Sequence, residues 1–288
     1  EIIDNSVDEY IMGYGKEISI NIESKVVEVR YYGRGIPLGK LLECVSSINT
    51  GAKYEGEVFK KTVGLNGIGS KAVNALSEYF YVESTRGGES RSLVFKKGEL
   101  VEDSGIYNSD KKEGTLVRFI ADSMIFGNYH YYREYVVSML KDYVFLNKEL
   151  RIIYNGELFY SEGGIRDLIM EKANEEEMLH PPVYLCGEDF EFCFTYCNGR
   201  SYEEYYSYVN GQYTRQGGTH LSSFKESFCR VIREFYKKDY DSGDIRMSLL
   251  AVISLRMEDP VFESQTKSKL GSILIKEGGQ SIKSYIFD

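Results

Sequence analysis

The sequence predicts an α+β protein of two domains, covering residues 1–163 and 164–288. A chain of 288 residues commonly holds one large or two medium domains, and its 42% hydrophobic and 27% charged residues are typical of a globular protein. Segments with helical and strand periodicity are mixed, without the regular βα alternation of a parallel sheet. The tract Ser161-Glu162-Gly163-Gly164 separates two groups of such segments, so we place the domain boundary there.

The first domain begins with a helix and continues mainly as strands. Apolar residues recur at helical spacing within 1–12, whereas residues 17–23 and 26–31 have the composition and length of strands. Further helices are expected at 41–48, 71–79 and 132–143, and further strands at 80–85, 91–95, 115–119, 150–154 and 158–160. Residues 50–69 are rich in glycine and lysine, which is typical of a long loop that closes over a ligand.

The second domain is predicted from the same patterns. Helices are expected at 165–172 and 219–238, an acidic loop at 175–177, and strands at 183–186, 190–197, 205–209 and 249–256. His220 follows three small residues at the start of a helix, so we assign it to capping or packing and not to catalysis. We interpret His130 and His180 as surface or structural residues, and the tyrosines of 202–208 as strand packing.

The composition of the chain argues against several classes of protein. No apolar run approaches the ~20 residues of a membrane helix, and the acidic opening Glu1-Ile2-Ile3-Asp4 is unlike a signal peptide. The five cysteines are odd in number and form no CxxC pair, which indicates a reduced, cytoplasmic protein with no zinc site. The net charge of −9 argues against the whole chain being a DNA-binding surface.

The first helix carries a pattern suited to water activation beside a metal ion. Glu1, Asn5 and Asp8 are spaced so that they share one helical face, and Glu9 follows. A carboxylate can take a proton from water, and an Asn oxygen can ligate Mg²⁺ without adding charge. An acidic helix face is also common on solvated surfaces, so this pattern alone does not define a site.

A second candidate is the glycine-rich segment Gly64-Leu65-Asn66-Gly67-Ile68-Gly69, which leads into the helix expected from Lys71. Glycines at a helix start let backbone N–H groups approach phosphate oxygens. It is not the dinucleotide-binding signature, because no strand directly precedes it and no acidic residue follows at the required distance.

The order of the motifs resembles the Bergerat-type (GHKL) ATP-binding fold. The motifs are Glu1 to Glu9, then Gly33-Arg34-Gly35-Ile36-Pro37, then the glycine-rich segment, then Gly114-Thr115 with the strand that follows. Segments 208–211, 216–220 and 260–270 are similar to the second domain of type II DNA topoisomerase B subunits. The resemblance covers nearly the whole chain and implies an ATP-binding sandwich in 1–163 and a transducer domain in 164–288. Residues 32–40 look more like topoisomerase IV than gyrase.

The resemblance implies a role for each matching residue in the first domain. Glu1 matches the general base, Asn5 the Mg²⁺ ligand, and Glu9 with Arg34 a pair that braces the pocket floor. The remaining matches are contacts to the nucleotide: Gly35 and Thr115 on the adenine side, Lys53 on a phosphate, and Gly67 and Gly69 in the phosphate-cradling turn.

Two residues of the second domain also match nucleotide contacts. Gln265 and Lys267 match residues that reach the terminal phosphate, so Lys267 joins Glu1 as a candidate for the hydrolytic step. Without the flanking motifs, Lys267 and Lys269 would be interpreted as part of a basic surface helix.

Tyr31 departs from the family pattern. The family has Asp-x-Gly-x-Gly where this chain has Tyr31-Tyr32-Gly33-Arg34-Gly35, and that aspartate is the main contact to the adenine amino group. A charge-assisted hydrogen bond of this kind contributes roughly 1.5–3 kcal/mol. The ring either swings away and leaves a weak site, or fills the slot and prevents binding, and an engineered or sequence-level change at one position is a third explanation.

The function implied by the resemblance is the ATP-binding and ATP-hydrolysing gate of a type II topoisomerase, which drives DNA strand passage. Its implied cofactors are ATP and Mg²⁺, and its implied partners are a second copy of the B subunit, the A subunit and DNA. The family's N-terminal arm and its metal-binding domain are expected to lie outside this sequence. The alternative function is a nucleotide-incompetent clamp or interaction module, because of Tyr31.

Overall fold

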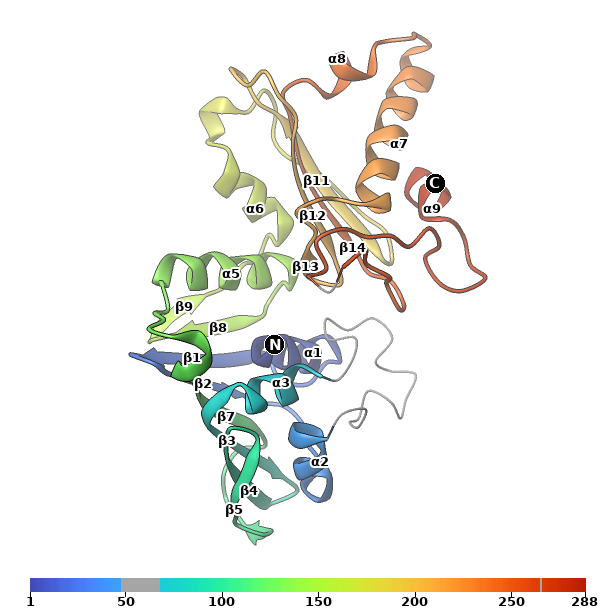
Figure 1. Cartoon of the computed structure of the whole chain (residues 1–288). Helices are drawn as coiled ribbons and strands as arrows, with labels where there is room; N and C mark the ends of the chain where they lie inside the picture. Colours follow the sequence, from blue (N-terminus) through green and yellow to red (C-terminus); the bar gives the residue numbers. More distant parts are fainter. Residues whose placement is uncertain (48–67, 265) are drawn as a thin grey trace. The chain divides into compact units, whose positions relative to one another are not determined.

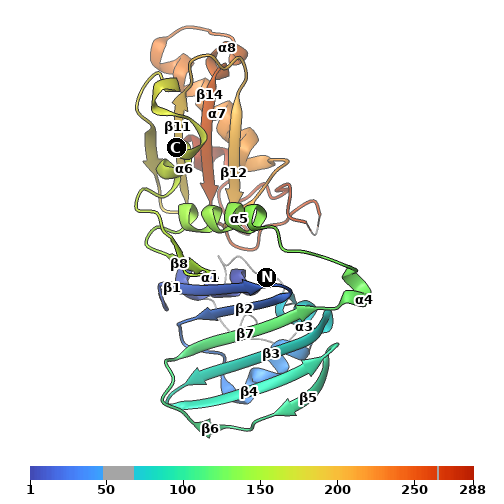
Figure 2. The ribbon, with the colours of Figure 1, turned by 90° about the vertical axis from the view of Figure 1, so that its left-hand side faces the viewer.

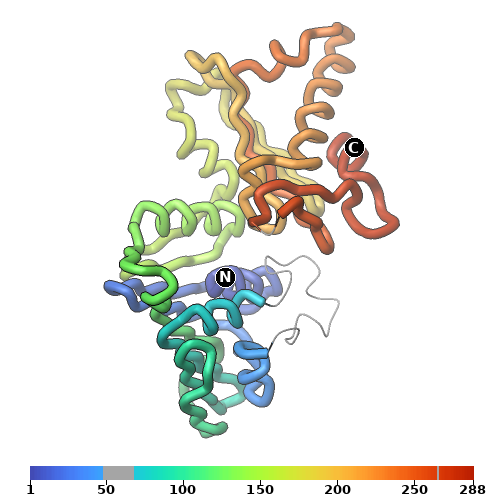
Figure 3. The backbone as a smooth tube through the Cα atoms, in the orientation of Figure 1, coloured from blue at the N-terminus to red at the C-terminus, as the bar shows by residue number. Residues whose placement is uncertain are grey.

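The computed structural model describes residues 1–47, 68–264 and 266–288. The chain divides into two compact units, Glu1–Ser161 and Glu162–Asp288, each with its own sheet (Figure 1). Figure 3 follows the backbone within each unit. The division lies close to the boundary that we place after Gly163.

The first unit is built on a nine-stranded sheet with the order β5-β4-β3-β7-β2-β1-β8-β9, and β6 pairs with β4 (Figure 2). All these pairs are antiparallel except β1 with β8. The strands are β1 (Glu17–Glu23), β2 (Val26–Tyr31), β3 (Ser77–Arg86), β4 (Glu89–Lys96), β5 (Glu99–Asp103), β6 (Tyr107–Asn108), β7 (Gly114–Ala121), β8 (Arg151–Tyr154) and β9 (Glu157–Phe159).

Three helices cover one face of this sheet: α1 (Ile2–Ile11), α2 (Leu41–Ser46) and α3 (Gly69–Ala75), which lie behind it in Figure 2. Every second residue of β2 is buried, so its inner face meets the helices. Val29 packs in one cluster with Val7 of α1 and Leu41 of α2. The 3-10 turn η1 (Leu38–Lys40) and the helices α4 (Ser123–Phe126) and α5 (Arg133–Leu146) complete the unit.

The second unit is a five-stranded sheet with the order β10-β11-β14-β12-β13. All seven residues of the central strand β14 are buried, as expected for a strand covered on both faces. The helices α6 and α7 lie on opposite sides of it (Figure 1). The elements are α6 (Ile165–Lys172), η4 (Glu175–Glu177), β10 (Val183–Cys186), β11 (Phe190–Tyr196), β12 (Glu204–Val209), β13 (Gln212–Tyr213), α7 (Thr219–Tyr236), α8 (Ser242–Arg246), β14 (Leu249–Leu255) and α9 (Ile282–Phe287).

The structure corrects several predicted elements. The helix expected at 71–79 ends at Ala75, because Ser77 and Tyr79 pair with β7 as the first part of β3. The strands β5 and β6 and the short helices α4, α8 and α9 were not predicted. Lys267, for which we predicted no helix or strand, lies outside any helix and has a φ of 53°. Within the described ranges, no helix is long and apolar enough to cross a membrane.

Candidate functional site

The first helix places its acidic residues at different depths. Ile2 and Val7 of α1 pack into the core, and this anchors the helix on the sheet. Asp8 is buried, Asn5 and Glu9 are half-buried, and Glu1 at the start of the helix is exposed. The candidate base Glu1 and the candidate metal ligand Asn5 therefore lie at the accessible end of α1.

The structure brings Glu1 against Gly69, although the two are far apart in the chain. A Cβ atom added at Gly69 would lie 1.8 Å from Oε2 of Glu1. A side chain at this position would have to push the end of the Glu1 side chain aside, so the carboxylate lies directly over the backbone where α3 begins. Ile68, the N-cap residue of α3, is exposed beside it. The carboxylate and the described end of the glycine-rich segment thus form one site.

Glu9 and Arg34 form a braced pair. The Arg34 Nη2 atom donates to Glu9 Oε1 at 2.8 Å, and the Arg34 backbone N–H donates to Oε2 at 3.1 Å. A Cβ at Gly33 would lie 2.9 Å from the same Oε2, so glycine permits this approach. The hydrogen bonds that Arg34 donates to Glu9 raise the pKa of the Arg34 guanidinium. Its Cζ atom lies 4.2 Å from the centroid of the Tyr14 ring. The pair ties the turn after β2 to α1.

Three backbone segments meet next to this pair. Gly35 has φ of 72°, and its Cα approaches the carbonyl oxygens of Thr85 and Gly114 so closely that an added Cβ would lie 2.6 and 3.2 Å from them. The next residue, Ile36, accepts a 2.7 Å hydrogen bond from Ser84 Oγ. Pro37 then leads into η1. The Gly-Arg-Gly-Ile-Pro turn is therefore held by β3 and the start of β7.

Tyr31 is buried, with 7% of its surface exposed, in the cluster between the sheet and the helices. The ring therefore does not swing out to solvent. Burial raises its pKa well above the ordinary value, with the nearby carboxylates of Glu9 and Asp8 adding to the effect, so the phenol stays neutral. Thr115 lies directly across the ladder, and its buried Oγ1 meets no partner at hydrogen-bonding geometry among the described residues.

Lys71 is a residue that the motif analysis did not assign to the site. It lies in the first turn of α3 and is 6% exposed. Burial lowers the pKa of its ammonium group. Asn74, one turn further on, donates to the Val45 carbonyl at 2.9 Å and fixes α3 against α2.

Six of the predicted site residues cannot be placed. Lys53, Gly64, Leu65, Asn66, Gly67 and Gln265 lie outside the described residues. Lys267 is half-buried in the second unit, where its backbone N–H donates to the Ser264 carbonyl at 3.0 Å.

Comparisons with known proteins identify the family to which this chain belongs. The family model for DNA gyrase B matches residues 164–286. The chain is similar to the B subunit of DNA topoisomerase 4 from Borreliella burgdorferi, with 51% identity over 95% of this chain and 45% of that protein. It is 34% identical to the B subunit of DNA gyrase from Thermotoga maritima, over 96% of this chain and 49% of that protein. The chain thus spans about half the length of these relatives.

Solved structures show the same fold. The 43K ATPase domain of Thermus thermophilus gyrase B matches with a TM-score of 0.76 and 26% identity, over 99% of this chain and 80% of that one. The topoisomerase IV ATP binding domain of Francisella tularensis matches with a TM-score of 0.73 and 25% identity, over 100% and 83%. The predicted α+β fold of the GHKL type is confirmed. The chain belongs to the family of type II DNA topoisomerase B subunits and corresponds to their ATPase region.

Proposed function

We propose that this chain binds ATP and hydrolyses it as the gate module of a type II DNA topoisomerase. The observation that carries the proposal is the contact between the Glu1 carboxylate and Gly69, which brings a candidate base next to the end of the glycine-rich segment. The alternative of a nucleotide-incompetent module is not favoured, since the similar structures are described as ATPase and ATP-binding domains.

The residues fit a nucleotide with one metal ion. Gly69 leaves its backbone free of any side chain beside Glu1, as a phosphate contact requires. Within the described part of the chain, no group of three His, Cys, Asp or Glu side chains could hold a metal by itself. Mg²⁺ is usually bound by one or two protein oxygens together with phosphates and water. Asn5 is the residue that would hold it, and the ion would neutralise phosphate charge.

In the proposed mechanism, Glu1 accepts the proton of the water that attacks the terminal phosphate. Its place at the accessible end of α1 lets it reach a water molecule, while the buried part of the helix keeps it in position. The Glu9–Arg34 pair holds the turn against α1. Lys53, Gln265 and Lys267 are proposed contacts to the phosphates, and Gly35 and Thr115 to the base.

We extend the proposal to the assembly through the relatives. Whole proteins of this family are named as B subunits of topoisomerase 4 and of gyrase. We therefore propose a second copy of this chain, an A subunit and DNA as partners, strand passage as the overall reaction, and the cytoplasm as its location.

The test of the proposal is a pair of measurements on the chain and its Glu1→Gln variant. Titration with a non-hydrolysable ATP analogue and Mg²⁺ should show saturable binding to both forms, because Gln keeps the shape of Glu. ATP hydrolysis should be lost in the variant, because the amide cannot accept the proton. No binding to the unmodified chain would refute the proposal, and hydrolysis by the variant would remove Glu1 from the role of base.

A further inference from the structure

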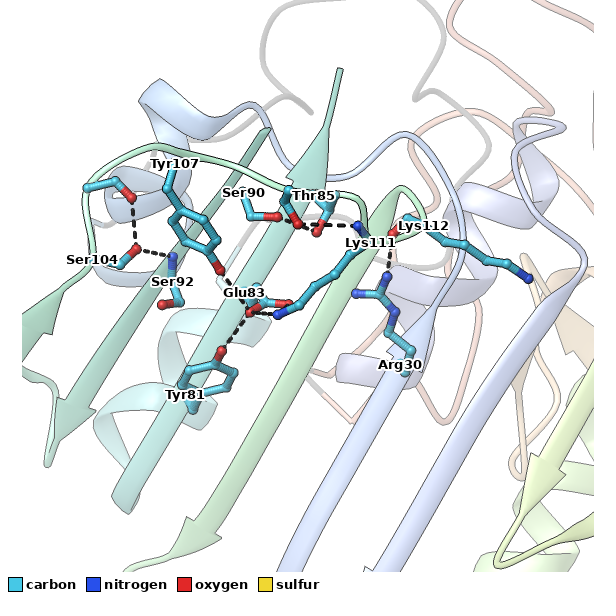
Figure 4. A network of polar contacts seen from close by, with 12 residues as sticks. Arg30, Tyr81, Glu83, Thr85, Ser90, Ser92, Ser104, Tyr107, Lys111 and Lys112 are labelled. Carbon is cyan, nitrogen blue, oxygen red and sulfur yellow. Dashed lines mark hydrogen bonds and ion pairs between the residues drawn. The ribbon is translucent and has the colours of Figure 1, made fainter. Parts of the chain in front are cut away.

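A buried carboxylate lies on the sheet of the first unit, away from the residues assigned so far. Glu83 of β3 is 4% exposed, and its oxygens accept hydrogen bonds from Lys111 Nζ at 2.7 and 3.0 Å and from the Tyr81 hydroxyl at 2.9 Å. The Tyr107 hydroxyl approaches the same oxygen at 3.4 Å (Figure 4). Side chains from β3, from β6 and from the segment before β7 thus converge on one charge.

Burial by itself would raise the pKa of Glu83. The hydrogen bonds from Lys111 and the two tyrosines outweigh burial and hold the pKa below its usual value. The carboxylate is therefore ionised. The ammonium group of Lys111 neutralises its negative charge, and the two tyrosine hydroxyls stabilise it further. Removing one partner of such a pair leaves an uncompensated buried charge, which is much costlier than losing an exposed pair.

Lys111 belongs to residues 104–113, here called the strap, which run from the end of β5 to Gly114. Beyond Glu83, the strap is held where β6 pairs with β4 and where the Ser109 N–H donates to the Gly88 carbonyl at 2.9 Å. Two more contacts hold its C-terminal end. Arg30 Nη2 donates to the Lys112 carbonyl at 2.5 Å, and the Gly87 N–H donates to Glu113 Oε1 at 2.7 Å. Figure 4 shows the side chains of Lys111, Lys112 and Arg30 in this arrangement. The strap is therefore tied to β2, to β3 and to the turn after β3.

The strap ends at a point of close backbone packing. A Cβ added at Gly114 would lie 2.1 Å from the Tyr31 carbonyl oxygen, and the Gly114 carbonyl in turn lies against Gly35. Thr115 pairs with both Tyr31 and Ser84 in the sheet. A shift of the strap would therefore move Gly114 and Thr115 relative to Tyr31 and the Gly35 turn.

We propose that Glu83 and Lys111 are positioning residues for nucleotide binding, because their ion pair fixes the strap and thereby preforms the site edge at Gly114, Thr115 and Gly35. The inference rests on the proposed function, since the edge is assigned to the base of the nucleotide. Their proposed role is to hold the site edge, without contact to the nucleotide. They raise the affinity because an edge that is already ordered does not have to be ordered when the nucleotide binds.

The experiment compares two matched ion pairs at opposite ends of β7. Lys97 pairs with Asp122 at 3.0 Å, and the side chains are 58% and 7% exposed. Lys111 and Glu83 pair at 2.7 Å with 54% and 5% exposed. Lys111→Met and Lys97→Met therefore remove equivalent charges, but only the first lies at the strap. Lys111→Arg keeps the positive charge. If Lys111→Met does not fold, Glu83→Gln is measured in its place, because it breaks the same ion pair from the other side.

Affinity for a non-hydrolysable ATP analogue with Mg²⁺ and amide hydrogen exchange are measured on the full chain and each variant. Lys111→Met should weaken binding by about tenfold and speed exchange in 104–115 and 33–37. Lys97→Met should lower the melting temperature as much as Lys111→Met does, but it should change neither the nucleotide affinity nor the exchange rate in these segments. Lys111→Arg should restore both the affinity and the slow exchange.

The outcomes separate this inference from the function on which it rests. If the unmodified chain binds no nucleotide, the proposed function fails and the inference fails with it. If the unmodified chain binds but Lys111→Met binds equally well, or if Lys97→Met weakens binding to the same extent, only the inference is overturned. Faster exchange in the strap without weaker binding also overturns it, because the strap would then be purely structural.

Discussion

At the scale of single residues, Tyr31 sets the character of the proposed site. It faces the helices with Val27 and Val29 and is buried beside the carboxylates of Asp8 and Glu9. A third carboxylate there would meet like charges, whereas a neutral phenol does not. The ring therefore suits the packing of this chain, even though the family resemblance implies an aspartate.

We predict that Tyr31→Asp strengthens ATP binding. A carboxylate that accepts the adenine amino group would tighten binding roughly ten- to a hundredfold and favour ATP over GTP. Nucleotide titrations, with thermal melts alongside, compare the chain with this variant. Tyr32→Asp is the matched control, because it introduces the same group one residue further along. Equal ATP affinity in the chain and in Tyr31→Asp would show that Tyr31 does not face the base.

His220 makes the second unit sensitive to acid. It is fully buried at the start of α7, and burial lowers its pKa to about 4. The Nε2 atom of His220 lies 3.1 Å from Thr214 Oγ1, within hydrogen-bonding distance. Its Nδ1 atom has no hydrogen-bond partner among the described residues. The expectation of a packing residue fits this environment.

The sign of the pH dependence follows from the lowered pKa. The unfolded chain takes up a proton near pH 6.5, whereas the folded chain does so only near 4. Stability is therefore full above about pH 6.5 and falls by on the order of 3 kcal/mol as the pH drops to about 4. Denaturant unfolding at several pH values should show this slope, and His220→Gln should flatten it. His130→Gln, at an exposed histidine, should leave it unchanged.

At the scale of elements, the turn after β2 depends on two conditions at Gly35. Its φ of 72° disfavours other residues, and an added Cβ would lie 2.6 Å from the Thr85 carbonyl oxygen. Gly87 shares only the first condition, since its φ is 62° and nothing lies within 4 Å of an added Cβ.

We predict that Gly35→Ala destabilises the first unit more than Gly87→Ala does. Both variants lose the freedom of glycine at positive φ, and the difference isolates the clash with β3. We expect an additional loss of about 1–3 kcal/mol, which denaturant unfolding would measure. Equal losses would mean that the turn can move away from Thr85 without cost.

At the scale of the whole molecule, the family resemblance assigns one residue of the second unit, Lys267, to the proposed reaction. Lys267 lies outside any helix, and by resemblance it reaches the terminal phosphate. Lys269, two positions away, pairs with Glu263 at 2.9 Å and offers a comparison of similar chemistry.

We predict that Lys267→Ala slows ATP hydrolysis much more than it weakens ADP binding, because ADP lacks the phosphate that this lysine would contact. Lys269→Ala should change neither quantity. Turnover and ADP titrations on the three proteins provide the measurement. Equal losses for ATP and ADP would place Lys267 outside the phosphate contact and confine its effect to the fold.

The sequence by itself determined the elements whose pattern is local. The bounds of β1, β2 and α6 agree with the expectations, because alternating or helical burial is encoded by neighbouring residues. The helix expected at 71–79 failed where Ser77 joined a ladder with Ala121, a distant residue. The strand β5 is exposed throughout, so it carries no apolar alternation and exists through its pairing with β4.

The candidate site, like the fold, could be predicted only in part from the sequence. Its motifs and their order were readable from the sequence, including Glu1, Asn5 and the Gly-Arg-Gly-Ile-Pro turn. Only the tertiary structure decided that Glu1 meets Gly69, that Tyr31 is buried, and that Lys111 neutralises Glu83. These contacts join residues far apart in the chain, and their free energy arises only when folding brings the segments together and removes them from water.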